Sequence, residues 1–570
     1  MIRGSSSIDL ATARQQKQPI YYVSFGPVGS GSFVPAIEEE FSTGPIYSAT
    51  KTRKILMSLP SGGGQSITEL AGTSTISGIN FTLQDRDGEI TKMVNTYPMK
   101  NRVVTLYGGY AGIPEAQFIK LFRGVLGNIT TSQDGTGWVF TVQDFQRLVK
   151  TTGFSATTTT LSAITEDDLI LTIQSAPTTS YPWFPPQTVS GFRGPVNFMK
   201  IDDEIVGYNS IAPSSTGDYN TVTLYARGLM GTTKNKHDVG ATVTNAIMLD
   251  GNPIDIMLWL LLSINGDGSN GPYDVFPNGQ GAEVPQDFIA VSEIEKQRDR
   301  FLSGSRFQFL ITDVEDIKHL IEEEILKIVN GYPIVKNDGR LSIKLYSPAF
   351  PVDVISNFTD DNIIGIPTLD MRLQSNSGFI NVVDFKYDYD VVGDTYYSDK
   401  IIVDGDSVTE SEENASLQIQ SRGLRGGMVF EGETLVQRFA NMVFNRYGKG
   451  CPNITLSTLY SESLCEVGDA VTLKSSYIPN SFQRVMNGDP IICEIVNKTI
   501  DYVGGKVNFT LRATGFNSKD RWFIISPDGM VGYDEATDQQ KSNYGFISTK
   551  LSDTVGVMGN TGDPGYKITP

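Results

Sequence analysis

The stretch from Val103 to Val149 constrains the fold more than any other part of the chain, because it combines three strand patterns with two turns. β-Branched and aromatic residues alternate along each pattern, which is typical of half-buried strands. Asp134-Gly135 lies between the last two patterns, and Asp-Gly is a preferred sequence for tight hairpin turns. A short helical segment begins after Asp144. The stretch therefore predicts a β module without catalytic residues, with strands at Val103–Tyr107, Phe118–Leu126 and Trp138–Val142.

The length and composition of the chain predict several β-rich domains. A chain of 570 residues exceeds what one core supports and indicates about three to five domains. The 39% hydrophobic content is enough to build cores, and 57 glycines with 27 prolines indicate many turns. The segment Leu464–Ala513 repeats the strand-and-turn character of the opening stretch and predicts a second barrel. We expect a mainly β protein with minor α, organised as a first β-barrel domain (1–150), an inserted small, peripheral β domain (151–250), a short helical or α+β domain (251–350), a second β-barrel domain (351–515) and an extended C-terminal arm (516–570).

Helical periodicity is limited to a few segments. Pro253 follows Asn252 in the order expected of a helix start. The segment Asp313–Val329 places its isoleucines on one side and three consecutive glutamates on the other, which predicts an amphipathic helix. Further expected elements are a polar helix at Ile8–Gln18, a helix at Glu433–Tyr447, and strands at Ile20–Phe25, Lys54–Pro60, Ile76–Leu83, Asn197–Ile201, Glu204–Tyr208, Thr221–Tyr225, Ala241–Asn245, Phe379–Tyr389 and Lys400–Val403.

Charge and cysteine usage exclude several classes of protein. A net charge of -18 argues against nucleic-acid binding, which needs a basic surface to displace counterions. Three cysteines form no disulfide framework and suit a reducing compartment. The N-terminus has no apolar secretory signal, and the most apolar run, Ile254–Ile264, is about half as long as a membrane-spanning helix. We therefore expect a soluble protein made in a cytosol.

No catalytic, cofactor-binding or metal site can be assembled from the sequence. The two histidines, His237 and His319, match no metal or catalytic-triad spacing. Cys451, Cys465 and Cys493 lack a Cys-x-x-Cys pair, so we expect buried structural thiols on strands. The glycine-rich Ser61–Gln65 lacks the lysine of a phosphate-binding loop and is expected to be a plain loop.

The stretch Asp384–Glu413 is strongly acidic and allows three interpretations. It contains ten carboxylates against only Lys386 and Lys400. Calcium binding and the lining of an electronegative channel are the functional interpretations. The spacing of a calcium loop is absent, which favours a solvated loop.

The order of several loose motifs resembles the tail hub, or baseplate hub, proteins of long-tailed bacteriophages and gene transfer agents. Each motif is weak by itself, and together they cover most of residues 8–515. They are Ala11–Arg14, Pro19–Phe25, Gly78–Gly88, Gly108–Tyr110, Phe122–Gly124, Thr141–Asp144, Ile201–Tyr208, Arg227–Thr232, His237–Gly240 and Leu464–Val471. Some tail-tip relatives hold an iron–sulfur cluster, but the three cysteines here lack the paired spacing.

The resemblance implies a structural virion protein rather than an enzyme. Hubs of this family are homotrimers whose two hub-type barrels per subunit form a pseudo-six-fold ring. Such a ring joins the six-fold tail tube and distal tail proteins to three-fold tip fibre or spike proteins. It bounds the channel for the tape measure protein and for DNA in transit, and an acidic lumen would repel that DNA. The implied location is the tail tip or baseplate of the virion after synthesis in the host cytoplasm, without stable membrane insertion.

Two other functions remain open from the sequence. One is a tail-tip protein that binds a receptor or cleaves a glycan, with Tyr181 or Trp183 of the aromatic loop Tyr181–Pro186 as a sugar-stacking platform. Long β-helical repeats, which are typical of depolymerases, are absent. The other is the hub of a bacterial secretion spike, which shares the fold and differs in its partners.

Overall fold

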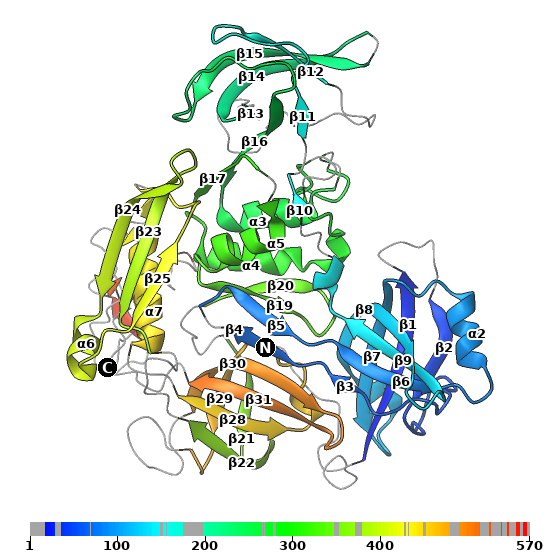
Figure 1. Ribbon diagram of the computed structural model, residues 1–570. Coiled ribbons are helices and arrows are strands. Elements are labelled where there is room, and N and C mark those ends of the chain that lie inside the picture. Colours follow the sequence, from blue (N-terminus) through cyan, green and yellow to red (C-terminus); the bar gives the residue numbers. More distant parts are fainter. Residues whose placement is uncertain are drawn as a thin grey trace.

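The computed structural model covers the chain from residue 1 to 570 (Figure 1). The described residues are 18–513, except 29–35, 69, 149–151, 155–156, 175–197, 216, 265, 267, 277–280, 314, 347–352, 371–378, 427–428, 431–432, 449–451 and 479–489, together with 524–525, 537, 544–545, 555–558 and 563–566. The predicted helix at Ile8–Gln18, the loop Tyr181–Pro186, Cys451 and most of the C-terminal arm lie outside these residues.

The first sheet contains the strands predicted from residues 103–149 as consecutive antiparallel neighbours. They are the central strands of a seven-stranded sheet in the order β2-β1-β7-β8-β9-β6-β3. A core of aromatic rings fills it, with Phe81 and Phe140 stacked at 5.3 Å between ring centroids. The strands are β1 (Pro19–Val28), β2 (Ile37–Ser42), β3 (Ser61–Gly62), β6 (Ile79–Gln84), β7 (Arg102–Tyr110), β8 (Ile119–Thr131) and β9 (Gly137–Gln143), with α2 (Glu89–Thr96), η1 (Glu115–Gln117) and η2 (Phe145–Leu148) between or after them.

Residues 54–58 connect the two sides of this sheet into a nearly closed barrel. On one side, the amide of Ser42 donates to the carbonyl of Lys54 at 3.0 Å. On the other side, the amide of Gln84 donates to the carbonyl of Leu56 at 2.8 Å, and that of Ser58 donates to Thr82 at 2.9 Å. The continuous strand predicted at Lys54–Pro60 is therefore wrong. The segment makes only isolated bridges because it turns from β2 to β6 within four residues.

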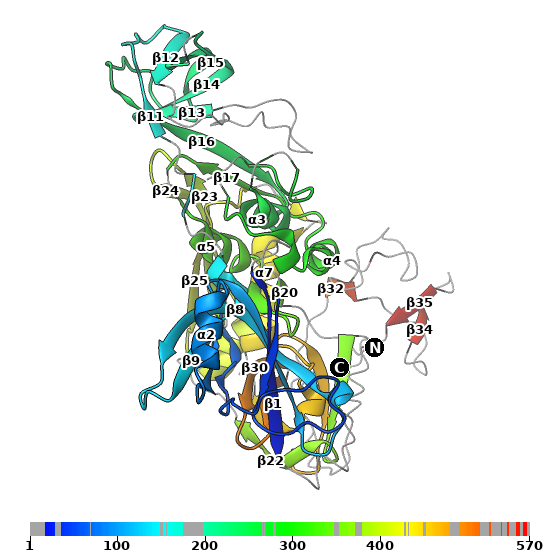
Figure 2. The same ribbon diagram turned by 90° about the vertical axis from the view of Figure 1, so that its right-hand side faces the viewer.

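The insert forms its own sheet at one end of the molecule, with the helical region between it and the two large sheets in both views (Figures 1 and 2). Its order is β11-β16-β13-β14-β15-β12, and the predicted strands of this region are all present. Strand β16 continues beyond the insert and pairs with β17, so it ties the insert to the helical region. The strands are β11 (Thr157–Thr159), β12 (Ile170–Gln174), β13 (Phe198–Ile201), β14 (Glu204–Pro213), β15 (Tyr219–Leu229), β16 (Thr242–Gly251) and β17 (Phe307–Ile311).

The helical region confirms one predicted helix and corrects another. Helix α3 (Pro253–Leu262) begins as predicted, because the side chain of Asn252 accepts a hydrogen bond from the amide of Ile254. The continuous helix predicted at Asp313–Val329 is wrong: a short α5 (Ile317–His319) is followed by a π-helix, η4 (Leu320–Leu326). The amide of Lys327 bonds to the carbonyl of Glu322, five residues back, which widens the turn. The other elements are η3 (Gln286–Phe288), α4 (Val291–Phe301), the hairpin β19 (Gly331–Val335) and β20 (Leu341–Leu345), and the short pair β10 (Thr152–Gly153) and β18 (Glu315–Asp316).

The last third of the described chain builds a second sheet and a smaller three-stranded sheet. The second sheet runs β21-β29-β30-β31-β28-β22, with two further strands added through β30. The three-stranded sheet has the order β24-β23-β25 and packs on α7, where Phe385 contacts Phe439 edge-on. The elements are β21 (Val354–Thr359), β22 (Ile363–Asp370), β23 (Val382–Asp390), β24 (Thr395–Val403), α6 (Gly405–Ser411), β25 (Ser416–Gln420), β26 (Val429–Phe430), β27 (Glu433–Thr434), α7 (Leu435–Tyr447), β28 (Asn453–Thr458), η7 (Tyr460–Glu462), β29 (Ala470–Lys474), β30 (Ile491–Asp501), β31 (Lys506–Ala513) and the short β32 to β35 (Ile524–Ile525, Tyr544–Gly545, Val555–Met558, Asp563–Tyr566).

The predicted fold class, mainly β with minor α, is confirmed. The barrel expected near the C-terminus is an eight-stranded sheet that includes strands from the first 150 residues. The boundaries between the domains stay predictions. No helix within the described ranges is both long and apolar enough to cross a bilayer.

A hairpin formed by β4 (Gln65–Thr68) and β5 (Thr73–Ile76) supplies the two strands that join the second sheet through β30. The turn of this hairpin contacts the helical region. Gly72 has a φ of +66°, and a Cβ there would lie 2.3 Å from the carbonyl oxygen of Glu322 and 2.6 Å from the amide nitrogen of Lys327. Only glycine fits a left-handed position so close to another backbone.

We predict that Gly72→Ala destabilises the protein more than Gly135→Ala does. Both positions have a positive φ, but nothing lies within 4 Å of a Cβ at Gly135. The control should cost about 1 kcal/mol, the penalty of a left-handed alanine. The clash at Gly72 should cost about 1–3 kcal/mol more. Unfolding monitored by tryptophan fluorescence measures both variants, and equal midpoints would contradict the contact.

Candidate functional site: the joint between the two large sheets

The candidate site is the joint at which the first sheet, the second sheet and the helical region meet. Buried apolar residues of both large sheets belong to one continuous core. The β4–β5 hairpin crosses from the first sheet and pairs with β30, with Ser66 opposite Asn497 and Gln65 opposite Lys498. With its amide suitably oriented, Gln65 bonds both backbone groups of Val335 in β19, at 3.1 and 3.2 Å. One hairpin thus connects three parts of the molecule.

Four buried tyrosines, Tyr21, Tyr110, Tyr460 and Tyr502, form a tyrosine cluster at the joint. The first two lie in β1 and β7, and the other two follow β28 and β30. The rings of Tyr110 and Tyr460 stack at 5.3 Å, and that of Tyr502 meets Tyr21 edge-on at the same separation. Such aromatic pairs contribute beyond the area they bury.

The tyrosine hydroxyls bond across the boundary between the sheets. The hydroxyl of Tyr21 bonds the hydroxyl of Tyr460 and donates to the carbonyl of Tyr502 at 2.7 Å. The hydroxyl of Tyr110 donates to the carbonyl of Gly505 at 2.5 Å and accepts from the amide of Tyr460 at 3.2 Å. Burial raises the pKa of Tyr110 to about 12, so its hydroxyl stays protonated and donates at neutral pH.

Buried charged groups connect the second sheet to the helical region. The ammonium group of Lys498 on β30 donates to the side chain of Asn337 at 2.9 Å and to the carbonyl of Ser463 at 2.5 Å. Burial lowers the pKa of Lys498. Lys344 on β20 pairs with Asp469 at 2.8 Å. These groups hold the β19–β20 hairpin against the second sheet, because a misplaced partner would leave a buried charge unsatisfied.

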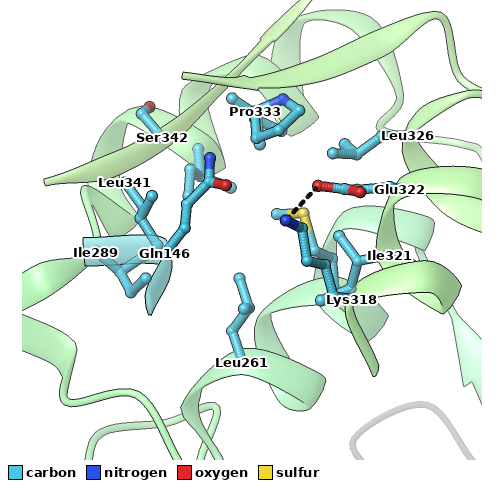
Figure 3. A pocket seen from close by; sticks show the side chains of 13 residues that line it. Gln146, Leu261, Ile289, Lys318, Ile321, Glu322, Leu326, Pro333, Leu341 and Ser342 are labelled. Atoms are coloured by element: carbon cyan, nitrogen blue, oxygen red, sulfur yellow. Dashed lines mark ion pairs between the residues drawn. The ribbon is translucent and has the colours of Figure 1, made fainter. Parts of the chain in front are cut away.

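The joint also contains a small apolar cavity beneath the π-helix (Figure 3). Its volume is about 60 Å³, and side chains of α3, α4 and η4 form much of its wall. Lys318 and Glu322 lie at its polar end, 3.8 Å apart, and burial raises the pKa of Glu322. Among the described residues that line the cavity, Glu322 is the one carboxylate, whereas glycoside hydrolysis typically uses two facing carboxyl groups. These residues therefore form no glycosidase-type acid pair.

The structure separates the residues that the sequence singled out. His319 lies in α5, far along the chain from His237, which is buried in the insert. Cys465 and Cys493 are both buried; of these two, Cys493 lies on a strand, and burial raises the pKa of Cys465 to about 12. Within the described part of the chain, no three histidine, cysteine or carboxylate side chains are grouped to hold a metal ion.

Two expected loops are partly regular structure. The acidic stretch Asp384–Glu413 contains most of the β23–β24 hairpin and helix α6, so the solvated loop favoured from the sequence is wrong. Carboxylates are compatible with these strands because side chains alternate between the two faces of a strand, so those at every second position can point outward. The glycine-rich Ser61–Gln65 contains β3 and the first residue of β4, because both ends pair with neighbouring strands.

The insert contains a buried charged network that sequence spacing did not reveal. The carboxylate of Glu204 is fully buried and accepts hydrogen bonds from Arg227 at 2.6 and 2.9 Å. The ring of His237 lies 2.9 Å from Glu204 on one side and 2.9 Å from Asp202 on the other. Burial alone raises the pKa of Glu204, but the bonds from Arg227 and His237 outweigh it and lower the pKa to about 2.

We predict that the insert loses stability as the pH falls from about 4 to 2. The pKa of an unfolded glutamate is about 4.3. Because the folded pKa of Glu204 is lower, the ionised carboxylate stabilises the folded insert fully above pH ~4.3, and this stabilisation is lost as the pH falls to about 2. Glu204→Gln should remove this pH dependence and cost about 3–5 kcal/mol at neutral pH, because Arg227 stays buried without a charged partner. The exposed Glu166 provides the control, Glu166→Gln. Urea unfolding followed by hydrogen exchange in residues 198–245 measures both, and identical pH profiles would contradict the network.

We predict that Tyr110→Phe weakens the joint, because it leaves the carbonyl of Gly505 and the amide of Tyr460 without a partner. The expected cost is about 1–3 kcal/mol. Hydrogen exchange of residues 453–462 should accelerate at the same time. The matched control is Tyr47→Phe, since Tyr47 is 60% exposed. If both variants exchange alike, the hydroxyl of Tyr110 does not hold the joint.

Sequence reasoning missed the joint itself. Tyr21 lies within a predicted strand and Tyr110 shortly after one, but tyrosine on a strand is common and no spacing linked them to Tyr460 and Tyr502. The glycine-rich Ser61–Gln65, which leads into the β4–β5 hairpin, was expected only as a plain loop.

No protein-family model matches this chain, and no curated protein matches it. Similar solved structures include a tail protein from Neisseria meningitidis MC58, at 10% identity over 88% of this chain and 99% of that chain, with a TM-score of 0.35. The 43 kDa tail protein of prophage MuSo2 from Shewanella oneidensis matches at 9% identity over 81% and 97%, with a TM-score of 0.32. A chain of the native gene transfer agent virion matches at 11% identity over 67% and 86%, with a TM-score of 0.31. All three are tail or virion proteins, the class that the sequence resembles.

Proposed function

We propose that this chain is a structural subunit of a phage-type tail or baseplate hub, without enzymatic activity. In this role three copies close into a ring that joins the tail tube and distal tail proteins to tip fibre or spike proteins. The ring bounds the channel for the tape measure protein and DNA. The order of the sequence motifs supports this function, and the joint supplies the mechanical property that a ring wall needs.

The observation that carries the proposal is the shared core of the first and second sheets. Inter-domain contacts within one chain usually permit relative motion, unless the interface is large and hydrophobic. Here the apolar core is continuous, and the tyrosine cluster adds hydrogen bonds across it. Two sheets fixed in this way form one rigid segment of the proposed ring. A ring of identical subunits closes only if each subunit turns the chain of contacts by the same fixed angle, and a rigid segment keeps that angle constant.

Of the two parts that contribute the large sheets, residues 351–515 carry an acidic excess and residues 1–150 do not. Residues 351–515 contain 22 acidic and 13 basic side chains, whereas residues 1–150 contain 11 acidic and 14 basic ones. In the proposed ring, part of the acidic surface faces the lumen and prevents DNA from adhering.

The native mass of the purified chain tests the proposal. We predict a particle of three times 62.4 kDa by light scattering at micromolar concentration. A monomer that persists at tens of micromolar would overturn the ring. Cleavage of host polysaccharide by the purified protein would overturn the structural, non-enzymatic role.

A deletion of the insert provides a variant for the same measurement. Figure 1 places the insert away from the two large sheets, so the trimer should form without it. The amide of Thr160 donates to the carbonyl of Ala241 at 2.9 Å, and these residues are suitable ends for a short glycine-serine connection. Residues 247–251 must be kept, because they pair with β17. Loss of the trimer in a folded deletion variant would show that the insert is part of the ring.

A further inference from the structure

Strand β24 (Thr395–Val403) is a nine-residue edge strand with an unoccupied outer side. It is the terminal strand of the order β24-β23-β25, and no strand among the described residues pairs with its other edge. Figure 1 shows it at the outer margin of the molecule, beyond β23. Its unpaired amide and carbonyl groups form a template on which another extended chain can be added.

The face of β24 that points to solvent is largely apolar. Tyr397, Ile401 and Val403 lie on this face and are 75%, 62% and 51% exposed, with Asp399 between Tyr397 and Ile401. The opposite face packs inward, because Phe385 of the neighbouring β23 is buried against α7. Edge strands of soluble proteins are commonly protected by bulges, prolines or repeated charges. Here Asp399 and Lys400 are the only charged residues of the strand.

The segment that carries this edge is strongly acidic. Ten carboxylates and two lysines lie between residues 384 and 413, on β23, β24, α6 and their connections. An added strand is therefore attracted if it is cationic and repelled if it is anionic.

Within the described residues, the terminal strands of the other large sheets in a second copy do not supply a cationic strand. The terminal strands of the other large sheets, β2, β3, β11, β12, β21 and β22, contain no lysine or arginine. Strand β2 has three consecutive glutamates, Glu38 to Glu40. Charge complementarity therefore favours a different protein.

We propose that β24 is the docking edge for an extended, cationic segment of a partner protein, which adds as a fourth strand beside β24. The partner segment alternates basic residues with aliphatic ones. Its backbone pairs with β24, its aliphatic residues cover Ile401 and Val403, and its basic residues approach the carboxylates of the β23–β24 unit. This docking does not depend on the proposed ring, since it uses one subunit.

Binding of a labelled probe to the full-length protein tests this edge. The probe is a nine-residue fluorescent peptide of alternating lysine and valine with blocked ends, followed by fluorescence anisotropy. We expect saturable binding with a Kd of about 100 µM or lower that weakens with salt. A glutamate–valine peptide should bind at least ten-fold more weakly. The lysine–valine peptide with every second amide methylated should also bind at least ten-fold more weakly, because it cannot donate to the strand.

Positive charge introduced on the edge provides the matched protein variant. Ile401→Lys with Val403→Lys should weaken binding at least ten-fold, while Val503→Lys, at a residue 77% exposed in the β30–β31 turn, should not. Circular dichroism checks that both variants are folded. Equal binding of the methylated peptide, or unchanged binding to the double variant, would overturn the proposal. A change in native mass caused by the double variant would assign the edge to a second copy instead.

Discussion

The arrangement of the two large sheets depends on the hydrogen bonds of the Tyr110 hydroxyl. It donates to the carbonyl of Gly505 and accepts from the amide of Tyr460, so it satisfies two backbone groups of the second sheet from a side chain of the first. Backbone groups at a buried boundary need partners, because an unsatisfied one costs about as much as a lost hydrogen bond. The orientation of one sheet on the other is therefore fixed within their shared buried core.

The β4–β5 hairpin extends this coupling to the helical region. It leaves the first barrel, pairs with β30 and places Gly72 against the π-helix. A hairpin that contacts three parts of the chain makes their separate movement costly. Rigidity of this kind suits a protein whose proposed role is geometric, and it differs from the mobile interfaces common between domains.

Regular structure was largely predictable wherever one face of an element is buried. Strands β7 to β9, strands β13 to β16 of the insert and helices α3 and α7 were expected, because their apolar spacing follows the period of the element. The expectations failed where neighbours decide the conformation. Residues 54–58 bridge two strands instead of forming one, and the π-helix at Leu320–Leu326 replaces an α-helix with the same apolar residues. The candidate site was not predictable, since its tyrosines and the Glu204–Arg227 pair are brought together across long stretches of sequence.

The sequence by itself determined a mainly β chain with few helices, no assembled catalytic motif and an acidic balance, because composition and local periodicity contain that information. Tertiary structure decided which strands share a sheet, which tyrosines meet and which edge stays free. These depend on contacts between residues as much as 481 positions apart, such as Tyr21 with Tyr502. Local conformational preferences act only between residues that are close in the sequence, so they cannot select these partners. Packing and the need to satisfy buried polar groups select them.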